Sequence, residues 1–290
     1  MKKDGDRMEA DLHSHTTASD GTQSPRANVQ MALDAGLGAI AITDHDTISG
    51  VAEALAAGLE MGIVVVPGVE ISTVVSGQDI HILGYYMNIE DEQFLQRLSS
   101  LRETRDTRNE MIIARLQELG IDITMEEVLK EVANVKRKGD TVGRPHIAAV
   151  LLNKGYVSTI KEAFDRYLAT GAAAFANPPR IEPATAIAWI HEAGGKAVLA
   201  HPGVYHDDAL VEVITSQGLD GIEVYHADHS PEDEERYRLL AERKGLLITA
   251  GSDFHGVRGD TAFHGPIGSK RIGMGVVELL RSSVCFRSEF

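Results

Sequence analysis

The segment Ala10-Asp11-Leu12-His13-Ser14-His15 leads from a short apolar run directly into two histidines. Similar runs recur along the chain, and each has the length and composition of a strand that is buried on both faces of a parallel sheet. There are seven such runs: Ala10–His13, Ala39–Thr43, Ile63–Pro67, Ile80–Tyr85, Lys196–Ala200, Gly221–Tyr225 and Leu246–Ala250. This pattern predicts an α/β protein with a parallel sheet at its centre.

Helix signals separate several of these runs. Ser24-Pro25 and Ser230-Pro231 each combine a cap residue with a first-turn proline. Two more helices are expected at about Gly50–Met61 and from Pro183 to Gly194. Because strands and helices alternate, the sequence predicts a barrel whose active site lies at the rim formed by the carboxyl ends of the strands.

The alternation stops between about residues 88 and 179, where the pattern predicts helices only. We expect them at Glu92–Leu119, Met125–Val132, Pro145–Asn153 and Thr159–Leu168. A block placed between the fourth and fifth strands emerges from the rim, so we expect it to cover the site as a lid. The predicted domains are a catalytic barrel of residues 1–87 and 185–290 and a helical insertion of residues 88–184.

The composition limits the class of protein. The chain has 290 residues, enough for one large α/β domain, and its single cysteine, Cys285, excludes an intrachain disulfide. The charged N-terminus and the lack of a run of roughly 18 to 20 apolar residues predict a soluble, cytoplasmic protein that does not enter a membrane. The net charge of −15 argues against broad binding of nucleic acid. It permits a phosphorylated substrate, because bound divalent ions can dominate the local charge.

Side chains that commonly bind metals gather near the ends of the apolar runs. They are His13, His15, Asp20, His45, Glu70, His81, His201, Asp253 and His255. A core has no use for so many histidines and carboxylates, whereas a multinuclear metal centre does. Imidazole mixed with carboxylate suits Mn²⁺, Fe²⁺ or Zn²⁺ better than Mg²⁺ or Ca²⁺. Asp11 is expected to orient one imidazole, and Glu70 to follow the third strand.

Isolated histidines elsewhere are interpreted as surface or core residues, because a lone histidine is seldom a ligand. On this ground the predicted site leaves out His191, His206, His229 and His264.

The motifs resemble those of a known family. Asp11-Leu12-His13-Ser14-His15 with Asp20-Gly21 resembles the opening signature of the PHP (polymerase and histidinol phosphatase) family. Its later motifs resemble Thr43–Asp46, Gly68–Glu70, Ala200–Pro202 and Gly251–Gly256, while Gly143–His146 and Ala163–Leu168 in the insertion are similar to one branch of that family. This branch contains 3′,5′-nucleotide bisphosphate phosphatases and 5′-to-3′ exoribonucleases. The resemblance implies a distorted seven-stranded (β/α)7 TIM-like barrel, the PHP fold, with a helical insertion between strands 4 and 5.

The resemblance also implies a trinuclear site of two to three divalent ions, with Mn²⁺ expected and Fe²⁺ or Zn²⁺ as alternatives. It assigns a first ion to His13, His15, Glu70 and Asp253. A second ion would share Glu70 and be bound also by His81 and His201, and a third would be bound by Asp20, His45 and His255. The chemistry implied is hydrolysis of a phosphoester by metal-activated water.

Other residues are candidates for proton transfer and substrate binding. Asp46 and His226 are alternative general acids, and Glu223 is expected either to contact substrate or to form a structural salt bridge at the rim. Arg144 precedes Pro145 at a predicted helix start, where a phosphate can bind, so we expect it to act as a phosphate clamp.

His146 and Arg180 are expected to assist the clamp. Relatives commonly carry a basic residue in the stretch that here reads Gly171-Ala172-Ala173-Ala174-Phe175, so one expected phosphate contact is missing.

The leading hypothesis is a metal-dependent phosphoesterase that acts on a nucleotide, either a 3′,5′-bisphosphate that yields AMP and phosphate or the 5′ end of an RNA. No obligate protein partner is indicated. One alternative is a phosphatase of a small metabolite such as histidinol phosphate. Another is a PHP module that binds metal or nucleic acid without turnover, which the complete set of ligands disfavours. Hydrolysis of C–N bonds is disfavoured because no lysine stands at a suitable strand end.

Overall fold

The computed structural model describes residues 8–132, 139–258, 261–262 and 264–282, and its central element is a sheet of eight strands. The strands are β1 (Glu9–Asp11), β2 (Ala39–Ile42), β3 (Val64–Val75), β4 (Gln78–Tyr85), β5 (Lys196–Leu199), β6 (Gly221–His226), β7 (Leu247–Gly251) and β10 (Ile272–Gly273). Their order in the sheet is β10-β1-β2-β3-β4-β5-β6-β7. Each of the seven apolar runs overlaps one of the strands β1 to β7, although β3 extends well beyond the predicted end at Pro67.

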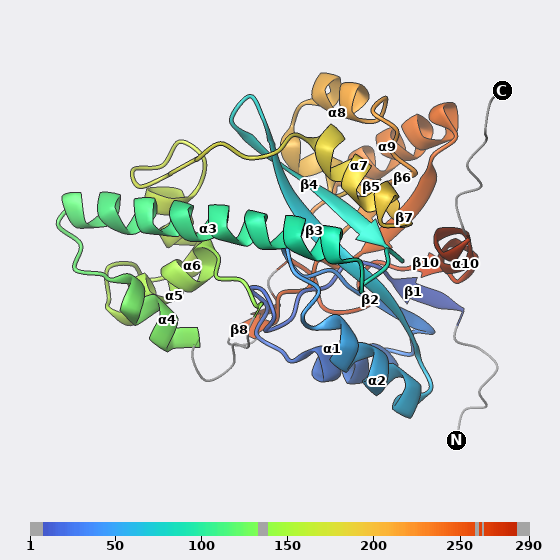
Figure 1. Cartoon of the computed structure of the whole chain (residues 1–290), viewed down its shortest axis with the longest axis horizontal. Coiled ribbons are helices and arrows are strands. Elements are labelled where there is room, and N and C mark those ends of the chain that lie inside the picture. The colour runs from blue at the N-terminus through green and yellow to red at the C-terminus, as the bar shows by residue number, and fades with distance from the viewer. Residues whose placement is uncertain (1–7, 133–138, 259–260, 263, 283–290) are drawn as a thin grey trace.

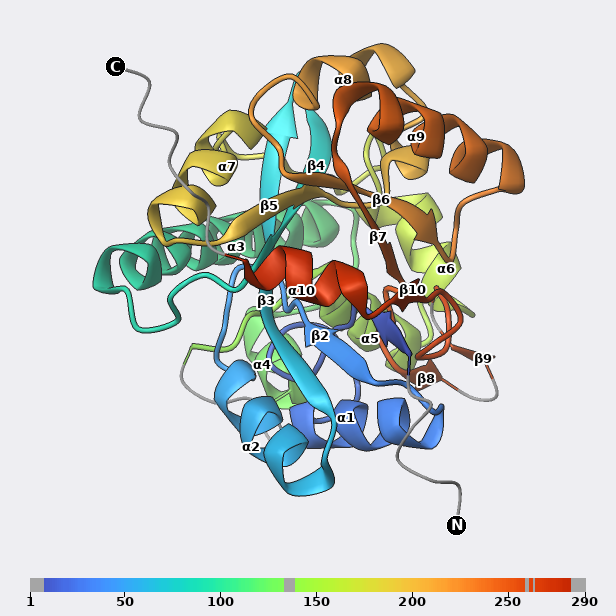
Figure 2. The ribbon, with the colours of Figure 1, turned by 90° about the vertical axis from the view of Figure 1, so that its right-hand side faces the viewer.

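The sheet curls into a nearly closed barrel (Figure 2). Just beyond β1, the Leu12 N–H donates to Ala250 O in β7 at 2.9 Å, and the His15 N–H donates to Phe254 O at 2.8 Å. These bonds join the first and last of the seven strands at the end of the barrel where the predicted ligands lie. At the other end, β10 pairs antiparallel with β1.

The prediction of an entirely parallel sheet is wrong at β4, which runs antiparallel to both β3 and β5. The cause is a hairpin turn of two residues between Val75 and Gln78. Ser76 and Gly77 adopt φ values of 51° and 86°, as the tight type I′ hairpin turn requires at both positions. Because β3 continues to this turn, Glu70 lies inside the strand. This corrects the expectation that Glu70 follows the third strand.

Helices surround the barrel wall and close one end of it. They are α1 (Pro25–Asp34), α2 (Val51–Met61), α7 (Pro183–Glu192), α8 (Asp208–Ile214), α9 (Pro231–Lys244) and α10 (Gly275–Arg281), with a 3₁₀ turn η2 at Pro202–Tyr205. α10 crosses the end of the barrel that faces the viewer in Figure 2, where Val277 and Leu280 pack with Leu12 and Val198. A small hairpin, β8 (Val257–Arg258) and β9 (Thr261–Ala262), follows β7. The opposite end is left for the site.

The insertion is helical, as predicted. It contains α3 (Glu92–Glu118), α4 (Met125–Val132), α5 (Arg144–Asn153), α6 (Ile160–Ala163) and a π-helical turn η1 (Phe164–Leu168). In Figure 1, α4, α5 and α6 lie beside one end of α3, and the other end of α3 lies on the barrel. Phe94 and Leu98 accordingly belong to the core around β3 to β6, whereas Ile112 and Leu116 belong to a second core within the insertion. α3 therefore contributes to both units, and the domain boundary at residue 88 stays a prediction.

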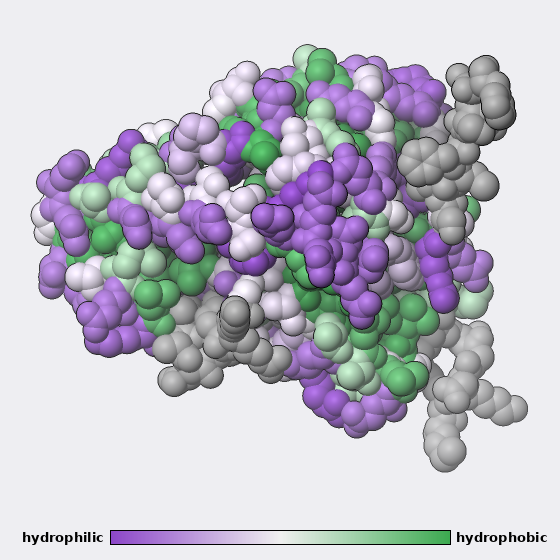
Figure 3. All heavy atoms as spheres, in the orientation of Figure 1, coloured by the Kyte–Doolittle hydropathy of each residue, from purple (hydrophilic) through white to green (hydrophobic). Residues whose placement is uncertain are grey.

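The outer surface in this orientation mixes hydrophilic and hydrophobic side chains (Figure 3). Hydrophobic residues gather over α2 and the start of β3, where Leu59 and Val64 are exposed. Within the described ranges, no helix combines the length and hydropathy needed to cross a membrane.

Candidate metal centre

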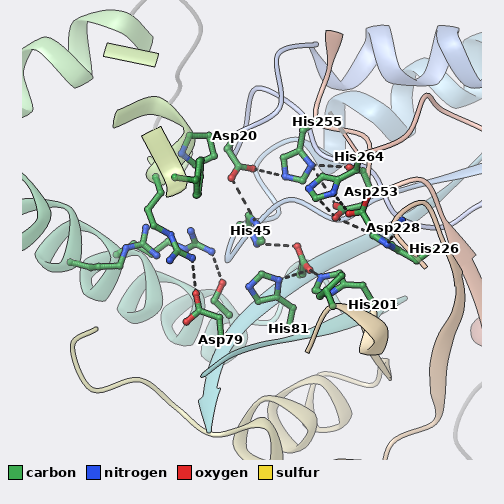
Figure 4. A pocket seen from close by; sticks show the side chains of 18 of the residues that line it. Asp20, His45, Asp79, His81, His201, His226, Asp228, Asp253, His255 and His264 are labelled. Carbon is green, nitrogen blue, oxygen red and sulfur yellow. Dashed lines mark hydrogen bonds and ion pairs between the residues drawn. The ribbon is translucent and has the colours of Figure 1, made fainter. Parts of the chain in front are cut away.

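The structure brings all nine predicted ligand residues together at the open end of the barrel. Figure 4 labels Asp20, His45, His81, His201, Asp253 and His255. The nine residues come from the segment after β1, from the loops after β2, β5 and β7, and from within β3 and β4. His81 is part-buried, and the other eight are buried: His13, His15, Asp20, His45, Glu70, His201, Asp253 and His255. The sequence predicted that these side chains lie close together, although His13 and His255 are 242 positions apart in the chain.

Two of these histidines lie close to each other and to two carboxylates. His13 Nε2 lies 3.2 Å from both His15 Nε2 and Asp253 Oδ1, and 3.5 Å from Glu70 Oε1. His15 Nε2 lies 3.1 Å from Asp253 Oδ1 and 3.2 Å from Glu70 Oε2. Atoms that bind an ion tetrahedrally at about 2.1 Å are roughly 3.4 Å apart. The four side chains therefore have the spacing of a metal site.

The remaining ligands lie on either side of this group. Glu70 Oε1 is 2.8 Å from His81 Nδ1 and 3.1 Å from His201 Nε2, so the same carboxylate serves two sets. Asp20 Oδ1 is 3.3 Å from His255 Nε2, and Asp20 Oδ2 is 3.8 Å from His45 Nε2.

Acceptor atoms at the centre lack the hydrogen bonds that buried polar atoms normally make. Asp20 Oδ1 and Asp253 Oδ1 are buried and make no well-directed hydrogen bond with a described residue, although imidazole nitrogens lie 3.1 to 3.3 Å away. One nitrogen in each of His45, His81 and His201 likewise has no well-directed hydrogen bond with a described residue. Buried polar atoms are normally satisfied, so several orphaned acceptors in one cluster fit a site that binds cations.

The surroundings set the protonation of these groups. Burial acts to raise the pKa of Glu70, but the histidines around it, His81 first, hold the pKa well below its ordinary value. Burial lowers the pKa of His45 and His201 to about 4. Burial would also lower the pKa of His15, yet Asp253 and Glu70 raise it to about 10. Burial would lower the pKa of His13 too, yet Asp253, Glu223 and Glu70 raise it well above its ordinary value, so binding of a cation must displace protons from both His13 and His15.

Glu223 does not line the cavity, so its position favours the structural alternative over the predicted contact with substrate. It lies behind the ligands, with its oxygens 3.1 and 3.2 Å from His13 Nδ1, and it accepts the His201 N–H at 2.9 Å. A carboxylate in this place keeps the proton of His13 on Nδ1 and leaves Nε2 free to bind a metal.

Asp11 supports the backbone and does not orient an imidazole, which corrects the expectation from the sequence. Its carboxylate accepts the backbone N–H groups of Ser252 at 3.0 Å, Gly268 at 2.8 Å and His13 at 3.3 Å. Asp11 therefore joins the loops after β1 and β7.

The backbone at the centre is held in unusual conformations. Asp46, His201 and Asp253 have φ values of 54°, 27° and 50°, in the left-handed region that non-glycine residues seldom adopt. Gly251 precedes the last ligand loop, and a Cβ there would lie 2.1 Å from the Cβ of His13. Such local strain is typical of functional sites that the surrounding structure holds in place.

Two residues outside the predicted site, Asp228 and His264, also line the cavity. His264 lines the cavity, its Nδ1 pairs with Asp228, and its Nε2 lies 3.6 Å from Asp253 Oδ2. This position favours including His264 among the candidate site residues. The available signal was its position in a polar loop after the last strand, at the rim where barrel sites lie.

Of the other omitted histidines, His191 pairs with Asp220 at 2.7 Å and His229 bonds the backbone oxygen of Val224 at 2.8 Å, and neither lines the cavity.

Next to the ligands is a cavity of about 340 Å³ that the insertion helps to enclose. The insertion and the segment after it supply Pro145, Phe164 and a group of arginines that we call the arginine cluster. Its members are Arg105, Arg108, Arg144 and Arg180. Arg144 donates to Asp79 Oδ2 at 2.6 Å, and Arg180 pairs with the other oxygen of Asp79. The predicted clamp residues thus reach the site.

His146 does not line this cavity, so its expected help in the clamp is not supported by its position. Its Nδ1 instead accepts the Gly143 N–H at 2.9 Å and caps the start of α5.

Comparisons with known proteins agree with this geometry. A model of the PHP domain matches residues 11–176. The 5′-3′ exoribonuclease Rnm of Escherichia coli strain K12 is 37% identical over 254 residues, which cover 84% of this chain and 84% of that protein. The 3′,5′-nucleoside bisphosphate phosphatase of Chromobacterium violaceum is 33% identical over 250 residues, covering 84% of this chain and 86% of that protein. The crystal structure of a candidate metal-dependent phosphoesterase from Bifidobacterium adolescentis superimposes with a TM-score of 0.85 at 32% identity, covering 93% of this chain and 94% of that one.

Proposed function

The chain belongs to the PHP domain family, and from this membership we propose that it is a metal-dependent phosphoesterase acting on a nucleotide or on the 5′ end of an RNA. The single observation that carries the proposal is the pair His13 and His15, whose Nε2 atoms each lie 3.1 to 3.5 Å from carboxylate oxygens of Glu70 and Asp253, beside a cavity with an arginine cluster. Cationic groups next to a metal site suit a phosphorylated substrate. The names of relatives place nucleotides and RNA among the substrates to test.

We propose that one ion binds between His13, His15, Glu70 and Asp253. A second ion would bind between Glu70, His81 and His201, and a third between Asp20, His45 and His255. Divalent ions bound here would polarise the phosphate and bring the pKa of a water molecule towards neutrality. The mixed donor set favours Mn²⁺, with Fe²⁺ and Zn²⁺ as compatible alternatives.

His226 is the proposed proton donor to the leaving oxygen. Its Nδ1 accepts the backbone N–H of Asp228 at 3.1 Å, so the proton of a neutral ring sits on Nε2. That nitrogen lies 3.3 Å from Asp253 Oδ2, next to the proposed metal ligands. His226 lines the cavity and is therefore in reach of a substrate.

Asp46, the alternative donor, is held differently. It is buried, pairs with Arg105, and accepts the Ser72 N–H at 2.8 Å. Burial acts to raise its pKa, but Arg105 and the Ser72 N–H bring the pKa below the ordinary value. A carboxylate that stays ionised at neutral pH has no proton to give, so we assign Asp46 to positioning and not to proton transfer.

Arg144 is the proposed clamp for a phosphate oxygen. It begins α5, and Asp79 fixes one side of its guanidinium beside the cavity. The five donors of a guanidinium allow it to keep this carboxylate while it also binds a phosphate. The C–N hydrolysis alternative has little support, because no lysine is among the described residues that line the cavity.

The test is release of phosphate from adenosine 3′,5′-bisphosphate by Mn²⁺-loaded protein, with Asp253→Asn as the site variant and Asp34→Asn, on an exposed part of α1, as its matched control. We expect turnover in the wild type and the control, and none in Asp253→Asn. If folded, metal-loaded wild type releases no phosphate, the bisphosphate assignment fails. A 5′-phosphorylated oligoribonucleotide is then the next substrate, and histidinol phosphate represents the metabolite alternative.

A further inference from the structure

Tyr205, in the turn η2, places its hydroxyl between two strands of the barrel. Just beyond the ladder of β4 and β5, the Ala200 N–H donates to His81 O at 3.1 Å. In an antiparallel ladder such a pair also makes the reciprocal bond, from the His81 N–H to Ala200 O. Here the His81 N–H donates to the Tyr205 hydroxyl at 3.0 Å, and the hydroxyl donates to Ala200 O at 2.9 Å. One side-chain oxygen therefore replaces a direct bond between the two backbones.

The hydroxyl enters the ladder where two proposed metal ligands leave it. His81 is itself a ligand, and Ala200 directly precedes His201. Figure 4 shows His81 and His201 next to each other, and their ring centroids are 5.2 Å apart. Glu70 Oε1 lies 2.8 Å from His81 Nδ1 and 3.1 Å from His201 Nε2. Because the hydroxyl fills the space of the direct bond, it sets the separation of the backbones that carry these two ligands.

Tyr205 is itself held firmly in place. Its side chain is only 6% exposed, and its ring contacts that of His201, with the centroids 5.6 Å apart and the planes at 63°. Its backbone oxygen accepts the side-chain amide of Gln78, at the start of β4, at 2.8 Å. Tyr205 does not line the cavity, so it lies behind the ligands and out of reach of a substrate.

We propose that Tyr205 is a positioning residue for the second ion, and that its hydroxyl holds His81 and His201 at the separation at which both reach Glu70. This inference rests on the proposed metal-dependent function and extends it to a residue that binds neither metal nor substrate. Without the hydroxyl, the His81 N–H and Ala200 O would either stay unpaired or draw together into a direct bond. Either result moves the two ligands away from their shared position on Glu70.

A purely structural role for the hydroxyl makes a different prediction. If the hydroxyl only tied β4 to β5, Tyr205→Phe would lower the melting temperature of chelator-treated protein and leave the affinity for every ion unchanged. The proposal requires instead that the second ion is weakened selectively. The first ion would keep its affinity, because its proposed ligands include neither His81 nor His201.

The first experiment follows the binding of Mn²⁺ to chelator-treated protein by electron paramagnetic resonance. Two Mn²⁺ ions that share a carboxylate are exchange-coupled, so their signal differs from that of a single bound ion and reports the second ion separately. Outer partners of metal ligands typically contribute about 10- to 100-fold to affinity. We therefore expect the coupled signal to require about 10- to 100-fold more free Mn²⁺ in Tyr205→Phe than in the wild type, while the single-ion signal appears at an unchanged concentration.

Tyr156→Phe is the matched control for this titration. The Tyr156 hydroxyl also accepts a backbone N–H, that of Asp122 at 2.9 Å, but it lies in the insertion and does not line the cavity. The control should match the wild type. An equal Mn²⁺ dependence of the coupled signal in wild type and Tyr205→Phe overturns the proposal, and so does the lack of a coupled signal in Mn²⁺-saturated wild type.

A second variant serves if Tyr205→Phe does not fold. Gln78→Leu removes the bond to the backbone of Tyr205 and keeps the hydroxyl. It should shift the coupled signal in the same direction by about 2- to 10-fold, the worth of one neutral hydrogen bond. An unchanged signal in this variant also counts against the positioning role.

Turnover separates this inference from the proposed function. At saturating Mn²⁺, Tyr205→Phe should hydrolyse adenosine 3′,5′-bisphosphate with the wild-type KM, since Tyr205 does not line the cavity, and kcat should recover as Mn²⁺ is raised. An active variant whose coupled signal matches the wild type overturns the inference and leaves the proposed function intact. A selectively weakened coupled signal, without hydrolysis of any nucleotide by the wild type, supports the positioning role and refutes the proposed function.

Discussion

Substitution of Glu223 by glutamine tests the architecture behind the proposed metal centre. The carboxylate accepts from two directions, His13 Nδ1 at 3.1 Å and the His201 N–H at 2.9 Å. An amide has only one accepting oxygen. If that oxygen serves the His201 N–H, the NH₂ group faces His13 Nδ1 and forces the ring to carry its proton on Nε2, the atom that should bind the metal.

The size of the effect follows from these contacts. One charge-assisted hydrogen bond is lost, which costs about 1.5–3 kcal/mol, and outer partners of metal ligands typically contribute about 10- to 100-fold to affinity. The two estimates agree, because tenfold is about 1.4 kcal/mol. We therefore expect Glu223→Gln to weaken the tightest Mn²⁺ site by about 10- to 100-fold.

Calorimetric titration of Mn²⁺ into chelator-treated protein measures this change, with Glu212→Gln on the exposed side of α8 as the control. At saturating Mn²⁺ the KM for substrate should stay at the wild-type value, since Glu223 does not line the cavity. Unchanged metal affinity together with a raised KM would refute the reasoning and restore Glu223 as a substrate contact.

Three further predictions concern stability. Gly251→Ala should lower the free energy of unfolding by about 3 kcal/mol, because its Cβ would lie 2.1 Å from that of His13. Urea denaturation measures this, with Gly273→Ala as the control, since a Cβ there meets nothing within 4 Å. In chelator-treated protein, the contribution of His15 is complete below its unfolded pKa of about 6.5 and is lost as the pH rises towards the folded value of about 10. The melting temperature of the wild type relative to His15→Gln should fall across this window, and a constant difference would contradict the raised pKa. Adding Mn²⁺ should raise the melting temperature, by the equivalent of about 2.7 kcal/mol at a hundredfold excess over Kd, and Asp253→Asn should lose most of that rise.

Local signals explain why so much of the barrel could be predicted from the sequence. The Ser24 side chain accepts from the Ala27 N–H, and Ser230 forms a capping box with Asp233, so the helix starts follow from cap chemistry. The direction of β4 was missed because it depends on the Ser76-Gly77 turn. Two strand-like runs separated by such a pair are a hairpin signal, but the second run was assumed to be parallel.

Only some residues of the site could be predicted from the sequence. The ligands at strand ends could be predicted from the hydrophobic runs and motifs, because the barrel brings those ends together. The partners behind the ligands could not be predicted, since Glu223 faces His13 only through the pairing of β6 and β7 and the closure of the barrel by β1. Arg108 could not be identified either, because an arginine on a helix of mixed polarity is usually solvated. Its burial depends on how the insertion packs onto the barrel.

That packing limits how the insertion can act as a lid. Arg102 donates to the backbone oxygen of Asp46 at 3.0 Å, while Arg105 pairs with the Asp46 carboxylate and bonds Ser72 Oγ. Swinging the whole of α3 away would break these bonds and leave Asp46 buried without its cation. We therefore expect the part of α3 up to Arg105 to stay on the barrel if the insertion moves.

Hydrogen exchange can locate this boundary. Amides in the first half of α3 should exchange as slowly as those of β3, and amides of α4 and α5 should exchange faster. Uniform exchange along α3 and through α5 would mean that the insertion moves, or stays fixed, as one body. In Arg105→Met the amides in the first half of α3 should exchange faster, because the bonds from α3 to Asp46 hold this part of the insertion against the loop after β2.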